Sequence, residues 1–200
     1  MRPSSRSLKR LLAERPQVVA AGAHDALSAR LVEQAGFDAI WASGFGLSAV
    51  RAVPDASILT MSETLEATRA MVEATSIPII ADCDTGFGNA INVMRTVADF
   101  EAAGVAAISI EDNVFPKRCS FYAGVARELV PAEEHARKVA AAKAAQRSDD
   151  FVVIARTEAL EPRLNCYIRF TPDLWLAAAR AAETEIMAGI SRGVLHGMPV

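Results

Sequence analysis

Short runs of apolar residues alternate with longer stretches of helical periodicity along most of this chain, and this order constrains the fold more than any other feature. A short run that is apolar throughout is typical of a strand buried on both faces, as in a parallel sheet covered by helices. The runs lie at residues 18–22, 38–42, 77–82, 106–111 and 151–156. The sequence therefore predicts repeated βα units, in either an open doubly wound sheet or a closed (β/α)8 barrel.

The stretches between these runs carry helix signals. We predict helices at residues 25–36, 61–75, 92–104, 131–146 and 171–188, and a solvated or interface helix at 6–16. Thr60 or Ser62 is the expected cap of the second helix, and Gly104 is expected to end the third.

Composition excludes several classes of function. At 200 residues, with 52% hydrophobic residues and a formal net charge of −3, the chain can bury a sizeable core and has no basic surplus for nucleic acid. No window approaches the roughly 18 apolar residues of a membrane helix, and the basic N-terminus lacks the apolar centre of a secretory signal. We therefore expect a cytoplasmic protein. Cys83, Cys119 and Cys166 show no CxxC spacing, so we expect their thiols to be reduced.

Charged residues or a glycine-rich segment stand where four of the predicted strands end. They are Ser43, Gly44, Phe45 and Gly46 after the second strand, Asp82 and Asp84 at the third, Glu111 at the fourth and Arg156 at the fifth. Both candidate folds bind ligands at the carboxyl ends of their strands. Asp82, Asp84 and Glu111 together are typical oxygen ligands of a hard cation, most naturally Mg²⁺. Without a cation, such carboxylates would raise one another's pKa.

Each of these residues also has a simpler interpretation. A lone aspartate after a strand is more often a helix cap or turn former, and Asp84 precedes Thr85 and Gly86 in that way. Residues 43–46 could form a tight turn, or a run of backbone N–H groups that holds a carboxylate or phosphoryl oxygen. The combination at equivalent strand ends favours a functional site.

Four segments resemble the isocitrate lyase and phosphoenolpyruvate mutase superfamily, and most closely its phosphoenolpyruvate mutases. They are AGAHDALSARLVEQAGFDAIWASGFGLSA (21–49), VPDASILTM (53–61), ADCDTGFGNAINV (81–93) and EDNVFPKRCSFYAG (111–124), and the resemblance extends over about residues 18–160. It implies a (β/α)8 TIM-type barrel. Five strands cannot close that barrel. We therefore expect residues 1–160 to form its N-terminal part with most of the active site, incomplete after the fifth strand, and 161–200 to form a divergent helical segment.

The activity implied by the resemblance is an Mg²⁺-dependent isomerase reaction of phosphonate biosynthesis. It interconverts phosphoenolpyruvate and 3-phosphonopyruvate, so the partner is a small-molecule substrate, and the intact family implies a homo-oligomer. Alternatives within the same site are a phosphonopyruvate hydrolase and a C–C lyase like 2-methylisocitrate lyase. An alternative of another class is a catalytically inactive, truncated relative.

The resemblance also implies roles for individual residues. Asp84 would bind Mg²⁺ directly, and Asp82 and Glu111 would hold it through water. The substrate pocket would comprise Trp41, Ser43, Gly44, Phe45 and Arg156. The catalytic set would comprise Asp55, Lys117, Cys119, Ser120 and Arg156, with Arg156 as a clamp for anionic oxygens.

The segment 111–121 departs from both subfamilies that it resembles. Mutases carry a lysine and an asparagine where this chain has Asn113 and Cys119, and lyases follow the Lys-Arg-Cys triplet with Gly-His. Here Ser120 and Phe121 follow, so Cys119 could be a reactive thiol beside two cations or an ordinary residue of a loop. Residues 113–130 are the predicted lid over the site.

Overall fold

The computed structural model describes residues 3–119, 124 and 128–156, which all belong to the first of the chain's two units, Met1–Cys166. The second unit, Tyr167–Val200, lies outside the described residues. The helices are α1 (Pro3–Glu14), α2 (Ala26–Gln34), α3 (Gly44–Val50), α4 (Met61–Ala74), α5 (Ala90–Ala102) and α6 (Ala132–Ala145). The strands are β1 (Ala20–Ala23), β2 (Ala39–Ala42), β3 (Ile79–Asp82), β4 (Ala107–Glu111) and β5 (Val152–Arg156).

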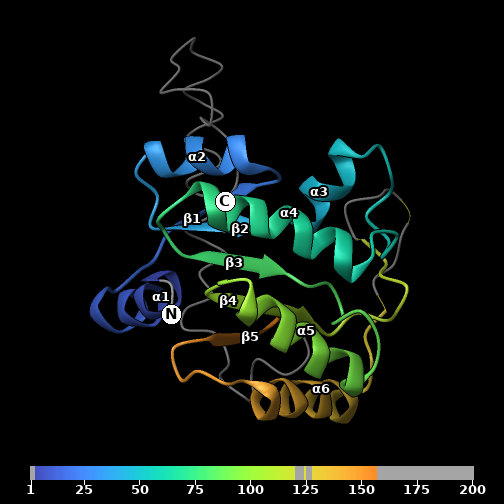
Figure 1. Cartoon of the computed structure of the whole chain (residues 1–200). Helices are drawn as coiled ribbons and strands as arrows, with labels where there is room; N and C mark the ends of the chain where they lie inside the picture. The colour runs from blue at the N-terminus through green and yellow to red at the C-terminus, as the bar shows by residue number, and fades with distance from the viewer. Residues whose placement is uncertain (1–2, 120–123, 125–127, 157–200) are drawn as a thin grey trace. The chain divides into compact units, whose positions relative to one another are not determined.

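The five described strands form one parallel sheet in the order β1-β2-β3-β4-β5 (Figure 1). Each strand pairs with the next in parallel register, for example Trp41 with Ile80 and Ile108 with Val153. A doubly wound sheet reverses its strand order at a switch point, whereas a barrel keeps the order of the sequence. The observed order is therefore that of the predicted barrel. The prediction that the barrel is incomplete after β5 concerns residues 157–200, which lie outside the described part of the chain.

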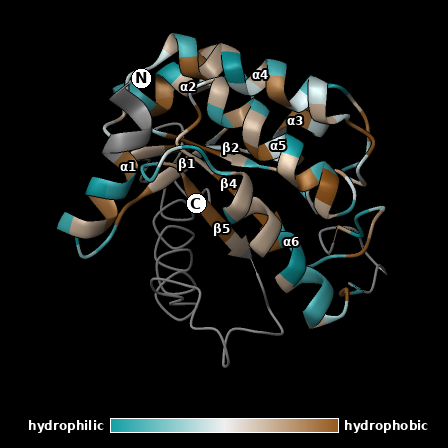
Figure 2. Ribbon diagram, turned by 60° about the horizontal axis from the view of Figure 1, so that its bottom comes forward, coloured by the Kyte–Doolittle hydropathy of each residue, from teal (hydrophilic) through white to brown (hydrophobic). Residues whose placement is uncertain are grey.

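Hydrophobic residues on the two faces of the sheet form separate clusters. One face carries Ile40, Ile79, Ile108 and Ile110, which pack beneath helices α2, α4, α5 and α6. These helices lie along the sheet, with α2 against α4 and α5 against α6 (Figures 1 and 2). The side chains of Ala39, Ile80 and Ala107 belong to the other cluster, which the fully buried Leu8 of α1 joins. The predicted N-terminal helix is present, although it spans Pro3–Glu14 rather than 6–16. It is not merely a solvated helix, because Leu8 anchors it in the core.

Local signals explain where two of the predicted helices begin. Thr60 caps α4, since its hydroxyl accepts a hydrogen bond from the Glu63 amide and the Glu63 carboxylate accepts one from the Thr60 amide. Asn89 and Asn92 make the same reciprocal pair at α5, which begins two residues before the predicted position. No described helix is both long and apolar enough to cross a membrane.

The short helix α3 corrects one interpretation of the sequence. Residues 43–46 do not form a tight turn, because the chain enters a helix at Gly44, and the amides of Gly44 and Gly46 already donate to Asp82 Oδ2 and Ser43 Oγ. Ser43 caps this helix by accepting a hydrogen bond from the Gly46 amide at 3.1 Å. Leu47 and Ser48 of α3 are buried, so tertiary packing holds a helix too short to be stable alone.

Candidate active site

The turn after β3 is held by backbone contacts to the end of β4. Asp82 ends β3, and its Oδ1 accepts a hydrogen bond from the Asp84 amide at 3.1 Å. The Asp84 carbonyl accepts one from the Glu111 amide at 2.7 Å, and the Cys83 carbonyl accepts one from the Gly86 amide at 2.8 Å. Asp84 has a φ of +47°, which is uncommon for a residue with a side chain. The structure thus brings together Asp82, Asp84 and Glu111, as the sequence predicts.

Asp82 also fixes the start of α3. Its Oδ2 accepts a hydrogen bond from the Gly44 amide at 3.2 Å. A Cβ atom at residue 44 would lie 3.0 Å from this oxygen, so a larger residue would push the Asp82 carboxylate from its place. The Gly44 amide therefore serves Asp82 in this structure, and the roles of Ser43 and Gly44 in substrate binding stay predictions.

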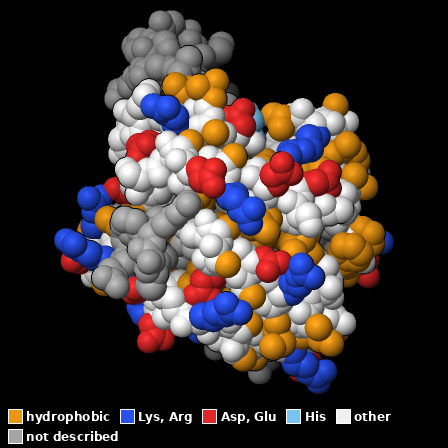
Figure 3. Space-filling model, in the orientation of Figure 1, with side chains coloured by type: hydrophobic (Ala, Val, Ile, Leu, Met, Phe, Trp, Pro, Cys, Tyr) orange, Lys and Arg blue, Asp and Glu red, His pale blue; other side chains and the backbone are white. Residues whose placement is uncertain are grey.

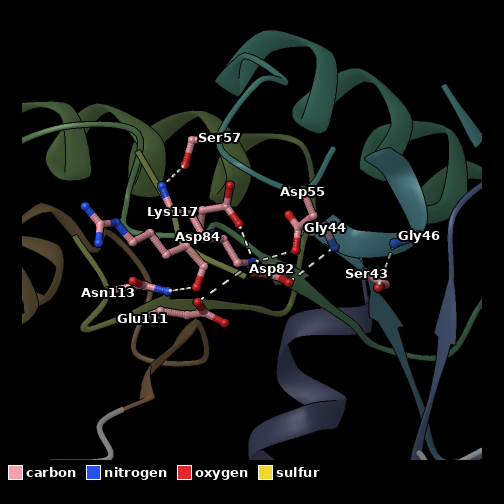
Figure 4. A network of polar contacts seen from close by, with 11 residues as sticks. Ser43, Gly44, Gly46, Asp55, Ser57, Asp82, Asp84, Glu111, Asn113 and Lys117 are labelled. Atoms are coloured by element: carbon pink, nitrogen blue, oxygen red, sulfur yellow. Dashed lines mark hydrogen bonds and ion pairs between the residues drawn. The ribbon is translucent and has the colours of Figure 1, made fainter. Parts of the chain in front are cut away.

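Lys117 lies among three carboxylates (Figure 4). Its Nζ is 2.8 Å from Asp84 Oδ1, 3.1 Å from Asp55 Oδ2 and 3.8 Å from Glu111 Oε2. The Lys117 backbone amide donates to Ser57 Oγ at 3.1 Å and so joins this loop to the one that carries Asp55. The sequence placed Lys117 and Asp55 in the site, but it did not predict that they form an ion pair, nor that Ser57 supports them.

The site is buried and anionic. Asp55, Asp82, Glu111 and Lys117 are all less than 10% exposed. Burial raises the pKa of Asp82 to about 7, with Lys117 opposing the shift, and burial likewise raises the pKa of Asp84. Burial disfavours the charged form of Lys117, but Asp82, Asp84 and Glu111 outweigh it and raise its pKa. The lysine therefore stays charged and offsets part of the negative charge.

Asp82, Asp84 and Glu111 carry the kind of oxygen atoms that a hydrated Mg²⁺ ion prefers. Among residues 3–119, 124 and 128–156, no group of three or more His, Cys, Asp or Glu side chains is arranged to hold a metal together. Mg²⁺ commonly takes only one or two carboxylates and keeps several waters, and it prefers oxygen ligands. The carboxylate oxygens of Asp84, Asp82 and Glu111 are ligands of this kind. Their assignment to a metal remains a proposal.

A small hollow beside these carboxylates is the candidate substrate pocket. Its lining includes Gly44, Asp82 and Asp84, together with Ser48, Ser57, Ile58, Leu59, Thr64 and Phe87. Trp41, predicted for the pocket, is not among these lining residues and packs against the cluster that contains Leu8 and Ile80, so its role in substrate binding stays a prediction. Figure 3 shows hydrophobic side chains on the side of the molecule where α3 and the neighbouring loops lie. Large exposed ones on these segments are Phe45, Val50, Ile58 and Phe115. The charged site therefore has an apolar border.

The two ends of the predicted lid pair with each other. Asn113 and Leu129 form an antiparallel bridge, and the Val114 and Val130 amides donate to the carbonyls of Glu128 and Asp112. Cys119 lies on this segment and is partly buried. The predicted Ser120 lies outside the described residues, as does the Arg156 side chain, although Arg156 ends β5 beside Glu111.

Two buried groups were not predicted as part of the site. Lys138 of α6 donates from Nζ to the Thr85 carbonyl at 3.2 Å. The sequence around Lys138 is that of a polar helix, and nothing in it indicates that this lysine is buried. Cys83 lies between the two aspartates, and burial raises the pKa of its thiol well above the ordinary value, which makes it a poor nucleophile.

Comparison with known proteins identifies the family. A family model described as phosphoenolpyruvate phosphomutase matches residues 8–182. The chain belongs to this family. One curated relative is the phosphonopyruvate hydrolase of Variovorax sp. It is 57% identical to this chain over 141 residues, which are 70% of this chain and 49% of that protein. The 2,3-dimethylmalate lyase of Eubacterium barkeri is 48% identical over 153 residues, 76% of this chain and 52% of that protein.

Solved structures of the phosphoenolpyruvate phosphomutase family support the same assignment. The phosphoenolpyruvate phosphomutase of Streptomyces platensis subsp. rosaceus matches with a TM-score of 0.75 and 46% identity, over 94% of this chain and 62% of that one. A phosphonopyruvate hydrolase complex with oxalate and Mg²⁺ matches with a TM-score of 0.69 and 46% identity, over 94% and 61%. The predicted superfamily fold is confirmed. The chain spans about half the length of the curated relatives it matches.

Proposed function

We propose that this protein interconverts phosphoenolpyruvate and 3-phosphonopyruvate with Mg²⁺. The observation that carries the proposal is the convergence of Asp55, Asp84 and Glu111 on the Lys117 ammonium, at the carboxyl ends of the sheet of a phosphoenolpyruvate phosphomutase family member. Buried carboxylates with a buried cation suit a small anionic substrate that binds with a divalent cation.

Asp84 would hold the ion directly, and Asp82 and Glu111 would hold it through water. The ion would supply positive charge that anchors the carboxylate and keto oxygens of the pyruvyl group. The relative that was solved with oxalate and Mg²⁺ supports this assignment. Asp82 has a second task, since its hydrogen bonds to the Gly44 and Asp84 amides keep two loops of the site in place.

Phosphoryl transfer through a loose transition state depends on positioning and charge neutralisation more than on acid or base chemistry. Lys117 would supply a fixed positive charge to the anionic substrate, since its pKa is raised by Asp82, Asp84 and Glu111 against the effect of burial. Arg156 at the end of β5 would supply a second one. The paired ends of segment 113–130 would help to keep water from the substrate while the phosphoryl group moves.

Two other activities have specific support. The 57% identity to a phosphonopyruvate hydrolase favours hydrolysis of the same C–P bond. The 48% identity to 2,3-dimethylmalate lyase, together with the partly buried Cys119 that follows Lys117 and Arg118, favours C–C cleavage. The proposed homo-oligomer rests on the family resemblance, and light scattering of the purified protein tests it.

Phosphorus NMR of the purified protein with Mg²⁺ and phosphonopyruvate separates these functions. A phosphoenolpyruvate signal supports the mutase, and inorganic phosphate identifies the hydrolase instead. No conversion by a folded sample overturns both, and turnover of 2,3-dimethylmalate would then identify a lyase. Asp84→Ala removes the proposed metal ligand and should abolish any conversion that depends on Mg²⁺. Lys143→Met, at an exposed position of α6, is the control and should not change the conversion.

A further inference from the structure

Lys138 reaches the active-site turn from the helix layer. It lies on α6 with only 4% of its surface exposed, and its Nζ donates to the Thr85 carbonyl at 3.2 Å. Thr85 directly follows Asp84, and the Asp84 carboxylate contacts Lys117. The contact therefore joins an outer helix to the residue next to the proposed metal ligand.

A lysine in this position needs a reason, because burying an ammonium group costs free energy unless the group is paired. Burial lowers the pKa of Lys138, and the nearby carboxylate of Glu134 only partly opposes this effect. That carboxylate is 3.9 Å away and half exposed. The hydrogen bond to Thr85 is the shortest polar contact of this ammonium among the described residues.

The 82–86 turn needs external support. Asp84 and Gly86 have φ angles of +47° and +88°, and a left-handed residue with a side chain persists only where its surroundings hold it. The Glu111 amide holds the turn from β4, and the Gly86 amide closes it from within. Lys138 of α6 holds it through the Thr85 carbonyl.

We propose that Lys138 is a positioning residue: it fixes the 82–86 turn and so sets the direction of the Asp84 carboxylate. It does not touch the substrate. The part that concerns a divalent cation rests on the proposed function, whereas the part that concerns the turn does not.

Hydrogen exchange without divalent cations tests the first part. Lys138→Met keeps the length of the side chain and removes the donor, so the Asp84, Gly86 and Glu111 amides should exchange about tenfold faster. Lys138→Arg, which keeps donors, should restore slow exchange. His135→Leu is the matched control, because His135 is buried on the same helix and has no hydrogen-bond partner among the described residues. Above pH 6.5, where the buried imidazole is neutral, this variant should leave these amides unchanged.

General destabilisation is excluded by a second control. Val32→Ala removes buried volume from α2, away from the turn, and should raise exchange throughout the protein without singling out these three amides. If Lys138→Met does not fold, Lys138→Gln is measured in the same way, with the same rise expected. Unchanged or uniformly raised exchange in the Lys138 variant overturns the positioning role.

Titration with Mg²⁺ alone, followed by calorimetry, tests the second part. Lys138→Met should bind the ion about tenfold more weakly than the parent protein, as is typical for loss of an outer support of a metal ligand, while His135→Leu binds as the parent does. Faster exchange without any Mg²⁺ binding by the parent protein would overturn the metal site and keep the positioning role. Equal affinity in the parent and Lys138→Met overturns the link between Lys138 and the cation.

Discussion

The Nζ atom of Lys117 lies 2.8 Å from the Asp84 carboxylate, although 33 positions separate the two residues in the sequence. The same ammonium contacts Asp55 at 3.1 Å, so it joins the loop after β4 to the loops that carry both aspartates. Removal of either partner of a buried ion pair leaves an uncompensated charge. The architecture of the site should therefore depend on this one lysine.

Replacing Lys117 with methionine should lower the free energy of unfolding by about 3–5 kcal/mol at pH 8 in the presence of EDTA. The reason is that Asp55, Asp84 and Glu111 lose the cation that compensates their buried charge. Urea unfolding measures the change. Lys143→Met, an exposed position on α6, should stay within about 0.5 kcal/mol of the parent. Equal loss in both variants would contradict the role of Lys117.

Replacing Gly44 with alanine should lower the free energy of unfolding by about 1–3 kcal/mol, because the new Cβ would meet Asp82 Oδ2 at 3.0 Å. The carboxylate would have to move, so Mg²⁺ affinity should fall as well. Gly22→Ala in β1 is the matched control, since a Cβ there has no atom within 4 Å. Urea unfolding and Mg²⁺ titration check both variants, and an unaffected Gly44→Ala would contradict the close approach.

The pKa of Asp82 predicts a pH dependence of stability without divalent cations. Burial raises this pKa from 3.8 to about 7, so the folded protein binds the proton more tightly than the unfolded chain. The stabilising contribution is complete below pH 3.8 and is lost as the pH rises through about 7. Asp82→Asn has no such proton. The difference in unfolding free energy between parent and variant should therefore change across this range, and parallel curves would refute the assignment.

His135 predicts the opposite dependence at lower pH. Burial lowers its pKa below 6.5, although Asp112 opposes the shift, so the unfolded chain binds the proton more tightly. The contribution of the neutral His135 to stability is complete above pH 6.5 and is lost as the pH falls through the pKa of His135 in the folded protein. His135→Leu should therefore gain stability over the parent between pH 6.5 and 5, which thermal unfolding at the two pH values can measure. A gain that does not depend on pH would show that only packing changed.

The sequence by itself determined the order of the described strands and of the helices other than α3, and it placed Asp82, Asp84 and Glu111 at strand ends. These features are local. Apolar runs and helical periodicity depend on neighbours a few residues apart, and the Thr60 cap of α4 needs only Glu63. The predicted start of α5 is two residues late, because Asn89 serves as the N-cap and the helix begins at Ala90.

Only the tertiary structure decided which of these residues meet. The sequential strand order separates a barrel from an open sheet, and no local signal contains it. Three contacts join positions that lie 33 to 53 residues apart in the sequence. They are the hydrogen bond of the Gly44 amide to Asp82, the ion pair of Lys117 with Asp84, and the hydrogen bond of Lys138 to Thr85. Such contacts depend on how the helices pack on the sheet, and burial then alters the pKa values of the charged groups they bring together.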